Sequence, residues 1–513
     1  MNNAVETASG TVSGTVEDGV LAFRTIPYAA STAGANRFLP PQPPTKWTGI
    51  RDCSEFTGRA PQAGLRPPTR PELENFAGAA DPSPETEDCL TVNVWTPGCD
   101  ATAKRPVMVW FHGGAFAYGN ANSPRTRGSR LAARNDVVVV TVNQRLNIFG
   151  HLDLSDAGGD AFRYSGNAGT LDMVAALEWV RDTIAGFGGD PDNVTIFGES
   201  GGGAKVSTLL AMPRARGLFH RAIIQSGAAV RLRTRERALA LTECVLRHLG
   251  VGAASLKAMP VARLLAAIEP AQKALGASPT PLFDRYPFGP VVDGDVLPAQ
   301  PFDPAASSVC ADVPLMIGDM KTETANFLAV VDRVWDRSLT AVEMRQRVES
   351  IAGPHTGRVV ELYGQLYADM NPAERLIAIT TDSNFRIRSL VLAQRRAALN
   401  RGPVWMYSFE WETPVLGGRL KAPHAMDVPF TFNTLDLTNA TGGRPDALAL
   451  ADTMSSVWAA FARNGRPDHA SIPAWPVYDS ATRATLVLDK VCRIENDPRA
   501  EERRLWQDIT GSV

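Results

Sequence analysis

The sequence predicts an α/β fold with a mostly parallel central sheet and helices on both of its faces. Between residues 90 and 225, short β-rich runs alternate with a segment whose apolar residues recur at helical spacing. Such strand–helix–strand alternation is typical of parallel sheets. The segment Val137–Val142 reads VVVVTV, as expected of a strand buried on both faces. Residues 230–280 and 324–400 are helical in pattern, interrupt this alternation and are expected to lie over one edge of the sheet.

Local composition and periodicity predict the elements along the chain. Residues 40–84 are rich in proline and predict irregular surface chain. In Thr170–Ile184, apolar residues recur at i, i+3, i+4, i+7 and i+11, which predicts a helix that ends at Gly186–Asp190. We expect one domain over residues 1–513, with helical insertions at about 230–280 and 324–400. The predicted strands are Leu90–Trp95, Pro106–Phe111, Val137–Val142, Asn193–Phe197, Ala222–Gln225, Pro314–Ile317 and Val404–Phe409.

Composition excludes several classes of protein. The 52 Lys and Arg residues against 54 Asp and Glu give a net charge of -2, which argues against binding nucleic acid through phosphates. No apolar run reaches the roughly 18–20 residues of a membrane span. The N-terminal MNNAVETASG does not resemble a secretory signal. The six cysteines form no CxxC pair, so neither a disulfide scaffold nor a structural zinc site is expected. We expect a cytoplasmic monomer or small homo-oligomer.

A candidate nucleophile follows the strand Asn193–Phe197. The segment Gly198-Glu199-Ser200-Gly201-Gly202 matches G-x-S-x-G, and Ala204–Met212 can continue as a helix. A serine at a sharp strand-to-helix turn is exposed at the edge of the sheet, and the helix offers N–H groups to an oxyanion. The alternative is a glycine-rich loop that cradles a phosphate. Neither G-x-G-x-x-G after the first strand nor GK[ST] occurs, which disfavours that alternative.

A second glycine-rich turn lies upstream of the serine. Val107–Phe116 reads VMVWFHGGAF, an apolar strand followed directly by an HGG turn. Loops of this type donate a backbone N–H to the oxyanion site in esterases and lipases. The alternative is a plain turn after a strand. The HGG segment lies before Ser200, at the end of an earlier strand, and this position favours an oxyanion loop over a plain turn.

A base and an acid are expected after the serine in chain order. Of the histidines at 112, 151, 220, 248, 355, 424 and 469, we favour His424, which lies in a loop after Val404–Phe409. A pKa near the ordinary ~6.5 would leave this imidazole neutral enough to act as a base. The acid should follow the strand at Pro314–Gly318. Spacing alone leaves both Asp319 and Glu323 open.

At this point the chain resembles the type-B carboxylesterase family, the group of α/β-hydrolases that includes para-nitrobenzyl esterases, cholinesterases and bile-salt lipases. The resemblance covers nearly the whole chain. It rests on Phe23-Arg24-Thr25-Ile26-Pro27-Tyr28-Ala29, Glu87–Val94, His112–Phe116, Asn143-Gln144-Arg145-Leu146, Ala185–Phe197, the Ser200 motif, Gln225-Ser226-Gly227 and His424–Phe430.

Position by position, the resemblance implies a function for each candidate residue. Ser200 would be the nucleophile, Glu323 the acid and His424 the base. The N–H groups of Gly114, Ala115 and Gly201 would form the oxyanion hole. Glu199 and Ser226 match positions that support the histidine in relatives.

The chain departs from the family pattern at three positions. Position 201 is Gly where relatives often have Ala, and Thr25 replaces a Gly. Cys89 matches a cysteine that forms a disulfide in secreted relatives. Because this chain has no cysteine near Pro61, where the partner would lie, we expect Cys89 to be a free thiol.

The sequence therefore predicts a serine carboxylesterase that hydrolyses uncharged carboxylic esters through an acyl-enzyme. Small-molecule esters are its expected partners, as substrates. No metal or organic cofactor is implied. An amidase or carbamate hydrolase with the same triad is the alternative. A non-catalytic adhesion protein of this family is disfavoured, because Ser200, Glu323 and His424 are all present.

Overall fold

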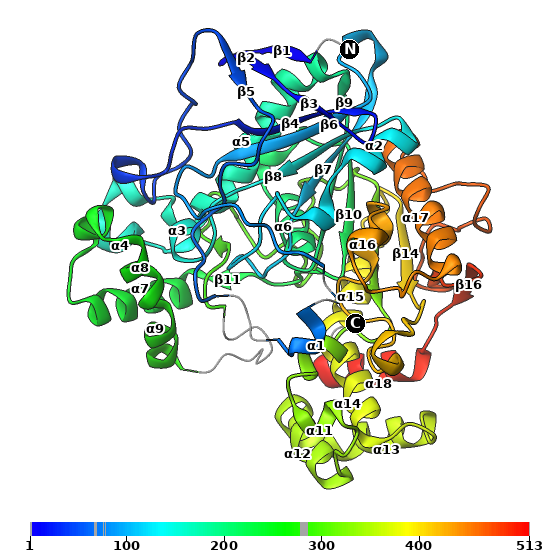
Figure 1. The fold of residues 1–513 in the computed structure, drawn as a ribbon. Coiled ribbons are helices and arrows are strands. Elements are labelled where there is room, and N and C mark those ends of the chain that lie inside the picture. The colour runs from blue at the N-terminus through cyan, green and yellow to red at the C-terminus, as the bar shows by residue number, and fades with distance from the viewer. Residues whose placement is uncertain (1–2, 66–68, 75, 77, 277–285, 512–513) are drawn as a thin grey trace.

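The computed structural model describes residues 3–65, 69–74, 76, 78–276 and 286–511 (Figure 1). The strands are β1 (Ala4–Thr7), β2 (Gly10–Ser13), β3 (Thr15–Glu17), β4 (Val20–Pro27), β5 (Ile50–Asp52), β6 (Thr91–Thr96), β7 (Arg105–Phe111), β8 (Val138–Val142), β9 (Gly189–Glu199), β10 (Arg221–Gln225), β11 (Arg233–Thr234), β12 (Val291–Val292), β13 (Leu315–Met320), β14 (Val404–Phe409), β15 (Ala484–Leu488) and β16 (Arg493–Asn496).

The helices fall between and after these strands. They are α1 (Pro71–Glu74), α2 (Ser129–Asn135), α3 (Asn147–His151), α4 (Ser155–Gly158), α5 (Ala168–Thr183), α6 (Gly201–Leu209), α7 (Arg235–Leu249), α8 (Val261–Ala266), α9 (Ile268–Leu275), α10 (Ala325–Leu328), α11 (Asp332–Trp335), α12 (Ala341–Ala352), α13 (Thr356–Leu366), α14 (Pro372–Thr381), α15 (Ile387–Ala397), α16 (Asp427–Thr431), α17 (Pro445–Asn464) and α18 (Ala500–Thr510).

An 11-stranded sheet forms the centre of the molecule, in the order β16-β15-β14-β13-β10-β9-β7-β8-β6-β4-β3. The strands from β8 to β15 run parallel, and antiparallel strands extend both edges. The mostly parallel sheet is therefore as predicted. All seven predicted strands are present. The main difference is β9, which begins at Gly189 rather than Asn193.

Helices cover both faces of this sheet because alternate strand residues point to opposite sides. Val107, Val109 and Phe111 of β7 pack in one core with α5, α6 and α15. Met108 and Trp110 pack in a second core with α2, α16 and α17. Figure 1 shows α16 and α17 together on the right-hand side of the sheet.

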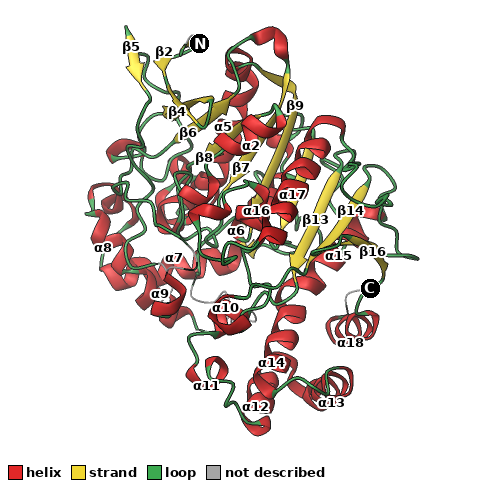
Figure 2. Ribbon diagram, turned by 45° about the vertical axis from the view of Figure 1, so that its right-hand side comes forward, coloured by secondary structure: helices red, strands yellow, loops and turns green. Residues whose placement is uncertain are grey.

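The two helical stretches predicted from the sequence both contain helices. Helices α7, α8 and α9 share a separate apolar cluster with Phe149, Leu152 and Phe162. Residues 277–280 of this stretch lie outside the described residues. Helices α11 to α14 extend below the sheet, at the end toward which the arrowhead of β13 points (Figure 2). Helix α15 instead packs directly against β13 and β14.

The helices and the cysteines can be compared with what the sequence predicts for membrane spans and disulfides. Within the described residues, no helix combines the length and apolar character that a bilayer crossing requires. All six cysteines are free thiols, and Cys89 is buried.

Candidate active site

Strand order brings the predicted site segments to one edge of the sheet. Strand β9 lies between β7 and β10, with Phe111 and Ile224 both paired to Gly198. Strand β13 follows beside β10, where Gln225 pairs with Gly318. These strands are parallel, so the loops that follow them emerge at the same carboxyl edge. The serine turn, the HGG turn and the acid-bearing loop therefore converge through topology.

Ser200 occupies the turn between β9 and α6. Its φ of 57° with a ψ of -121° is a sparsely populated conformation, which costs an L-residue on the order of 1–3 kcal/mol. The two glycines of the motif allow this turn. A Cβ at Gly202 would lie 1.9 Å from the carbonyl oxygen of Phe111, and one at Gly198 would lie 2.5 Å from the carbonyl carbon of Gly202. The close approach of α6 to β7 thus requires G-x-S-x-G and leaves Ser200 half-buried at the N-terminus of the helix.

The HGG turn lies directly against this serine. Gly114 and Ala115 have φ values of 97° and 51°, so the chain turns sharply after β7. The N–H groups of Gly114, Ala115 and Gly201 have no hydrogen-bond partner within the described structure. A Cβ on Gly201 would lie 2.4 Å from Ala115 N, so these two donors are neighbours. The positive end of the α6 dipole adds to their field, and the arrangement can bind an anion.

Glu323 and His424 come from two loops that are tied together. The Thr322 hydroxyl donates to Leu420 O at 2.8 Å and accepts from Ala422 N at 2.9 Å. His424 Nδ1 lies 2.5 Å from Glu323 Oε2, and Glu323 Oε1 accepts from Met320 N at 2.8 Å. The carboxylate therefore orients the imidazole with Nδ1 as the donor.

The other open candidate for the acid, Asp319, makes no bond to His424. It is buried at the end of β13, and its Oδ2 has no hydrogen-bond partner in the part of the chain that the structure describes. Burial raises the pKa of Asp319 to about 7, with Arg499 opposing the shift. The structure thus brings Glu323, rather than Asp319, to the imidazole.

Nε2 of His424 faces Glu199, whose Oε1 lies 3.0 Å away. Nε2 has no well-aligned hydrogen bond among the described residues, so no bond joins it to the Ser200 hydroxyl. Catalytic hydrogen bonds of this kind often tighten only when substrate binds. The Ser226 hydroxyl is also buried without a partner in this region, so the structure does not join it to the histidine.

The two carboxylates change the proton affinity of the imidazole. Burial lowers the pKa of His424, but the charges of Glu199 and Glu323 outweigh burial and raise it to about 9. This differs from the ordinary value expected from the sequence, because the sequence does not show that two carboxylates flank the ring. Burial raises the pKa of Glu199 to about 8, against the opposing effect of His424.

Several residues of the site were not predicted from the sequence. Asp427 is buried, accepts from Gln225 Nε2 at 2.8 Å and from the Tyr407 hydroxyl at 3.1 Å, and its charge helps to raise the pKa of His424. The rings of Phe327 and Phe385 lie 5.0 and 4.9 Å from the His424 ring. Asp427 lies three residues after His424, but nothing local in the sequence indicates its partners.

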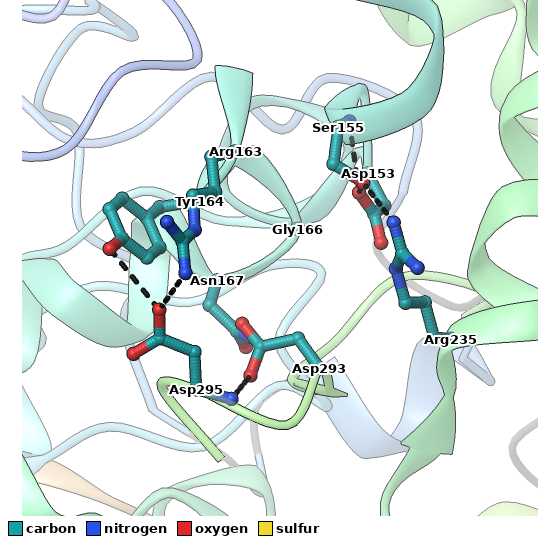
Figure 3. Close-up of a pocket in the computed structure, with 9 residues that line it drawn as sticks. All are labelled: Asp153, Ser155, Arg163, Tyr164, Gly166, Asn167, Arg235, Asp293 and Asp295. Atoms are coloured by element: carbon teal, nitrogen blue, oxygen red, sulfur yellow. Dashed lines mark hydrogen bonds and ion pairs between the residues drawn. The ribbon is translucent and has the colours of Figure 1, made fainter. Parts of the chain in front are cut away.

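A polar cavity of about 240 Å³ lies elsewhere in the fold (Figure 3). Its charged side chains bind one another: Asp295 accepts from Arg163 at 2.8 Å and from Tyr164 at 3.2 Å. None of the three predicted triad residues lines it. Within the described residues, no three His, Cys, Asp or Glu side chains are grouped as metal ligands. The lining residues are Asp153, Ser155, Arg163, Tyr164, Gly166, Asn167, Arg235, Asp293 and Asp295.

Comparison with known proteins agrees with this geometry. The chain is 36% identical to the para-nitrobenzyl esterase of Bacillus subtilis over 505 residues, which cover 98% of this chain and 97% of the relative. It is 33% identical to the phenmedipham hydrolase of Pseudarthrobacter oxydans over 493 residues, 94% of each chain.

A solved structure is similar over the same length. The carboxylesterase EST55 of Geobacillus stearothermophilus superposes with a TM-score of 0.84 at 37% identity, over 99% of this chain and all of the other. The α/β-hydrolase fold expected from the sequence is thereby confirmed. The model of the carboxylesterase family matches residues 1–506. With a serine turn, an anion-binding loop and a carboxylate–imidazole pair at one sheet edge, the chain belongs to the carboxylesterase family and is a carboxylic-ester hydrolase.

Proposed function

We propose that Ser200 is the nucleophile, His424 the general base and acid, and Glu323 the carboxylate that orients His424. The N–H groups of Gly114, Ala115 and Gly201 form the oxyanion hole in this proposal. The observation that carries it is the pairing of His424 Nδ1 with Glu323 Oε2 at 2.5 Å, while Nε2 of the same ring lies 3.0 Å from Oε1 of Glu199, the residue before Ser200. Glu199 adjusts the pKa of the imidazole.

The first step forms an acyl-enzyme. Nε2 of neutral His424 takes the proton of Ser200 as Oγ attacks the ester carbonyl carbon. The carbonyl oxygen becomes an oxyanion and accepts from the three N–H groups, each worth on the order of 3–4 kcal/mol in the transition state. His424 then gives its proton to the leaving alkoxide, which departs as the alcohol.

The second step releases the acid. Water loses a proton to Nε2 of His424 and attacks the acyl carbon, and the same N–H groups bind the second oxyanion. When the intermediate collapses, the proton on His424 returns to Ser200 Oγ. Glu323 remains ionised throughout and stabilises the imidazolium that forms in both steps.

Uncharged esters are the proposed substrate class. The rings of Phe327 and Phe385 provide an apolar surface beside His424. Glu323 and Asp427 are buried near the imidazole, and negative charge at these carboxylates would repel an anionic acyl group.

We further propose that the chain acts as one catalytic domain in the cytoplasm, as a monomer or small homo-oligomer. The six free thiols support a reducing compartment, because paired cysteines are typical of oxidising ones. Light scattering of the purified enzyme measures the oligomeric state.

The choice of acid is tested by two amide variants. Glu323→Gln removes the charge that orients His424 and stabilises its imidazolium, so kcat should fall by several orders of magnitude, on the order of 10⁴. Asp319→Asn, at a neighbouring buried carboxyl without a bond to His424, is the matched control and should change kcat only mildly. Turnover of p-nitrophenyl acetate measures both. The reverse ranking would reject Glu323 as the acid.

The substrate class is tested with two esters of similar size. We expect kcat/KM for p-nitrophenyl butyrate to exceed that for p-nitrophenyl hemisuccinate, its carboxylate-bearing counterpart, by on the order of 10²-fold, because an anion must approach buried carboxylates. Equal values for the two esters at low ionic strength would contradict the proposed preference for uncharged substrates.

A further inference from the structure

Lys205 is a fully buried lysine on α6, five residues after the serine. No carboxylate forms an ion pair with it among the described residues, and burial alone holds its pKa well below the usual range. An apolar side chain of similar length would occupy this position without the cost of burying an amine. The amine is therefore best explained by the groups that it binds.

Those groups belong to the HGG turn. Lys205 Nζ donates to the carbonyl oxygen of His112 at 2.7 Å, where the turn begins. It also lies 5.8 Å from the ring centre of Phe116, where the turn ends. With its amide oxygen turned toward Lys205, Gln144 accepts from Nζ at 2.8 Å, and the same oxygen lies 2.8 Å from His112 Nε2. One buried amine thus contacts both ends of the turn.

The contact fixes the direction of the peptide group that opens the turn. Lys205 holds the carbonyl of His112, the residue directly before the two glycines. In a trans peptide the N–H points opposite to the C=O. Holding the His112 carbonyl at Lys205 therefore fixes the direction of the Gly113 N–H and of the backbone that leads into Gly114 and Ala115.

Lys205 also connects the two halves of the oxyanion hole. It stands on the same helix as Gly201, whose N–H is one donor, and binds the loop that carries the donors Gly114 and Ala115. Here a misplacement of about 1 Å is enough to lower a reaction rate on the order of 10²-fold. A fixed link between helix and loop therefore bears directly on the chemistry.

We propose that Lys205 is a positioning residue that holds the HGG turn against α6, so that the N–H groups of Gly114, Ala115 and Gly201 converge on one oxyanion. This inference rests on the proposed function, because it assigns Lys205 to the oxyanion hole named there. Lys205 touches neither the ester nor Ser200, and acts through the backbone of His112 and the side chain of Gln144.

The test is Lys205→Met, which keeps an unbranched side chain and removes the N–H donors. We expect kcat/KM for p-nitrophenyl acetate to fall by on the order of 10- to 100-fold. Binding of an alkyl trifluoromethyl ketone, whose adduct with the serine carries an oxyanion, should weaken by the same factor. Binding of the matching methyl ketone, a probe of the ground state, should be unchanged. A general loss of structure would not produce this difference between the two ketones.

Thr208→Val is the matched control on the same helix. The Thr208 side chain is buried, and its hydroxyl donates only to Ala204 O, at 2.8 Å, within α6. This variant should keep wild-type kcat/KM and wild-type affinity for both ketones. Gln144→Leu removes one acceptor of Lys205 and should give a smaller loss with the same preference for the trifluoromethyl ketone. If Lys205→Met does not fold, the measurements on Gln144→Leu test the inference in its place.

Two results would overturn the inference. One is a folded Lys205→Met or Gln144→Leu protein with wild-type kcat/KM, and the other is an equal loss of affinity for both ketones. Ser200→Ala, measured in parallel, separates this inference from the proposed function. An inactive Ser200→Ala beside a fully active Lys205→Met rejects only the role of Lys205, whereas an active Ser200→Ala rejects the catalytic assignment itself.

Discussion

The imidazole of His424 lies between two carboxylates, and this arrangement governs how the enzyme should respond to pH. Glu323 holds Nδ1 at 2.5 Å, while Glu199 lies 3.0 Å from Nε2. Their negative charges favour the imidazolium and outweigh burial, which is why the pKa of His424 rises to about 9. The base is neutral only above that pKa, so kcat/KM should rise with pH up to it.

Glu199→Gln tests this electrostatic account. The substitution removes the negative charge beside Nε2 at nearly constant size, so the imidazolium loses stabilisation and the pKa of His424 falls. The acid limb of the kcat/KM–pH profile should move to lower pH, because His424 of the free enzyme then loses its imidazolium proton at a lower pH. Initial rates with p-nitrophenyl acetate across pH 5–10 measure the shift.

Glu349→Gln, an exposed position on α12, is the matched control and should leave the profile unchanged. An acid limb that stays in place, or moves to higher pH, in Glu199→Gln would contradict the assignment of Glu199 as the group that raises the pKa of His424.

At single residues, the sequence indicates the proposed triad but not its surroundings. Ser200 and His424 follow from local motifs and chain order. The choice between Asp319 and Glu323 needed the family resemblance. Lys205 was not singled out, because a lysine in a helix is ordinarily exposed and only the packing of α6 on the sheet buries it.

At the scale of elements, the distance between α6 and the HGG turn should control the proposed oxyanion hole. Gly201→Ala tests this distance, since its Cβ would lie 2.4 Å from Ala115 N and 2.9 Å from Ala115 Cα. Backbone atoms must shift to accept it, so kcat/KM should fall by on the order of 10-fold. Turnover of p-nitrophenyl acetate measures the loss.

Gly357→Ala is the control for adding a methyl group to the chain. Gly357 lies in α13, and a Cβ there would meet nothing within 4 Å. Its turnover should equal wild type. Wild-type turnover in Gly201→Ala would show that the loop and the helix are not held as closely as the structure has them.

The elements themselves were predictable where burial makes the pattern simple. Strand β14 has the predicted bounds, and β8 differs by one residue, because both are apolar on both faces. The prediction for β9 began four residues late. Its first part reads GDPDN, which is typical of a loop, and the pairing with β7 shifts register between Arg105 and Val107. Gly189 pairs with Arg105 and Val194 with Val107, so pairing at its two ends, rather than its own composition, makes this polar stretch part of β9.

At the scale of the molecule, the site depends on residues from distant parts of the sequence. The loop after β7, the turn after β9 and the loops after β13 and β14 emerge at the same edge because their strands run parallel in one sheet, where β10 lies between β9 and β13. The sequence predicts the parallel sheet, but no local pattern gives the order of its strands. The convergence of Ser200 with His424 is therefore the property of the whole fold on which the account rests.

Labelling by a fluorophosphonate tests this convergence most directly, because the reagent modifies a serine only when a base activates it. The account predicts one adduct per chain by intact mass, mapped to Ser200 by peptide sequencing, with activity lost in proportion to labelling. It predicts neither adduct nor ester hydrolysis in Ser200→Ala. An adduct on another residue, or wild-type hydrolysis by Ser200→Ala, would contradict it.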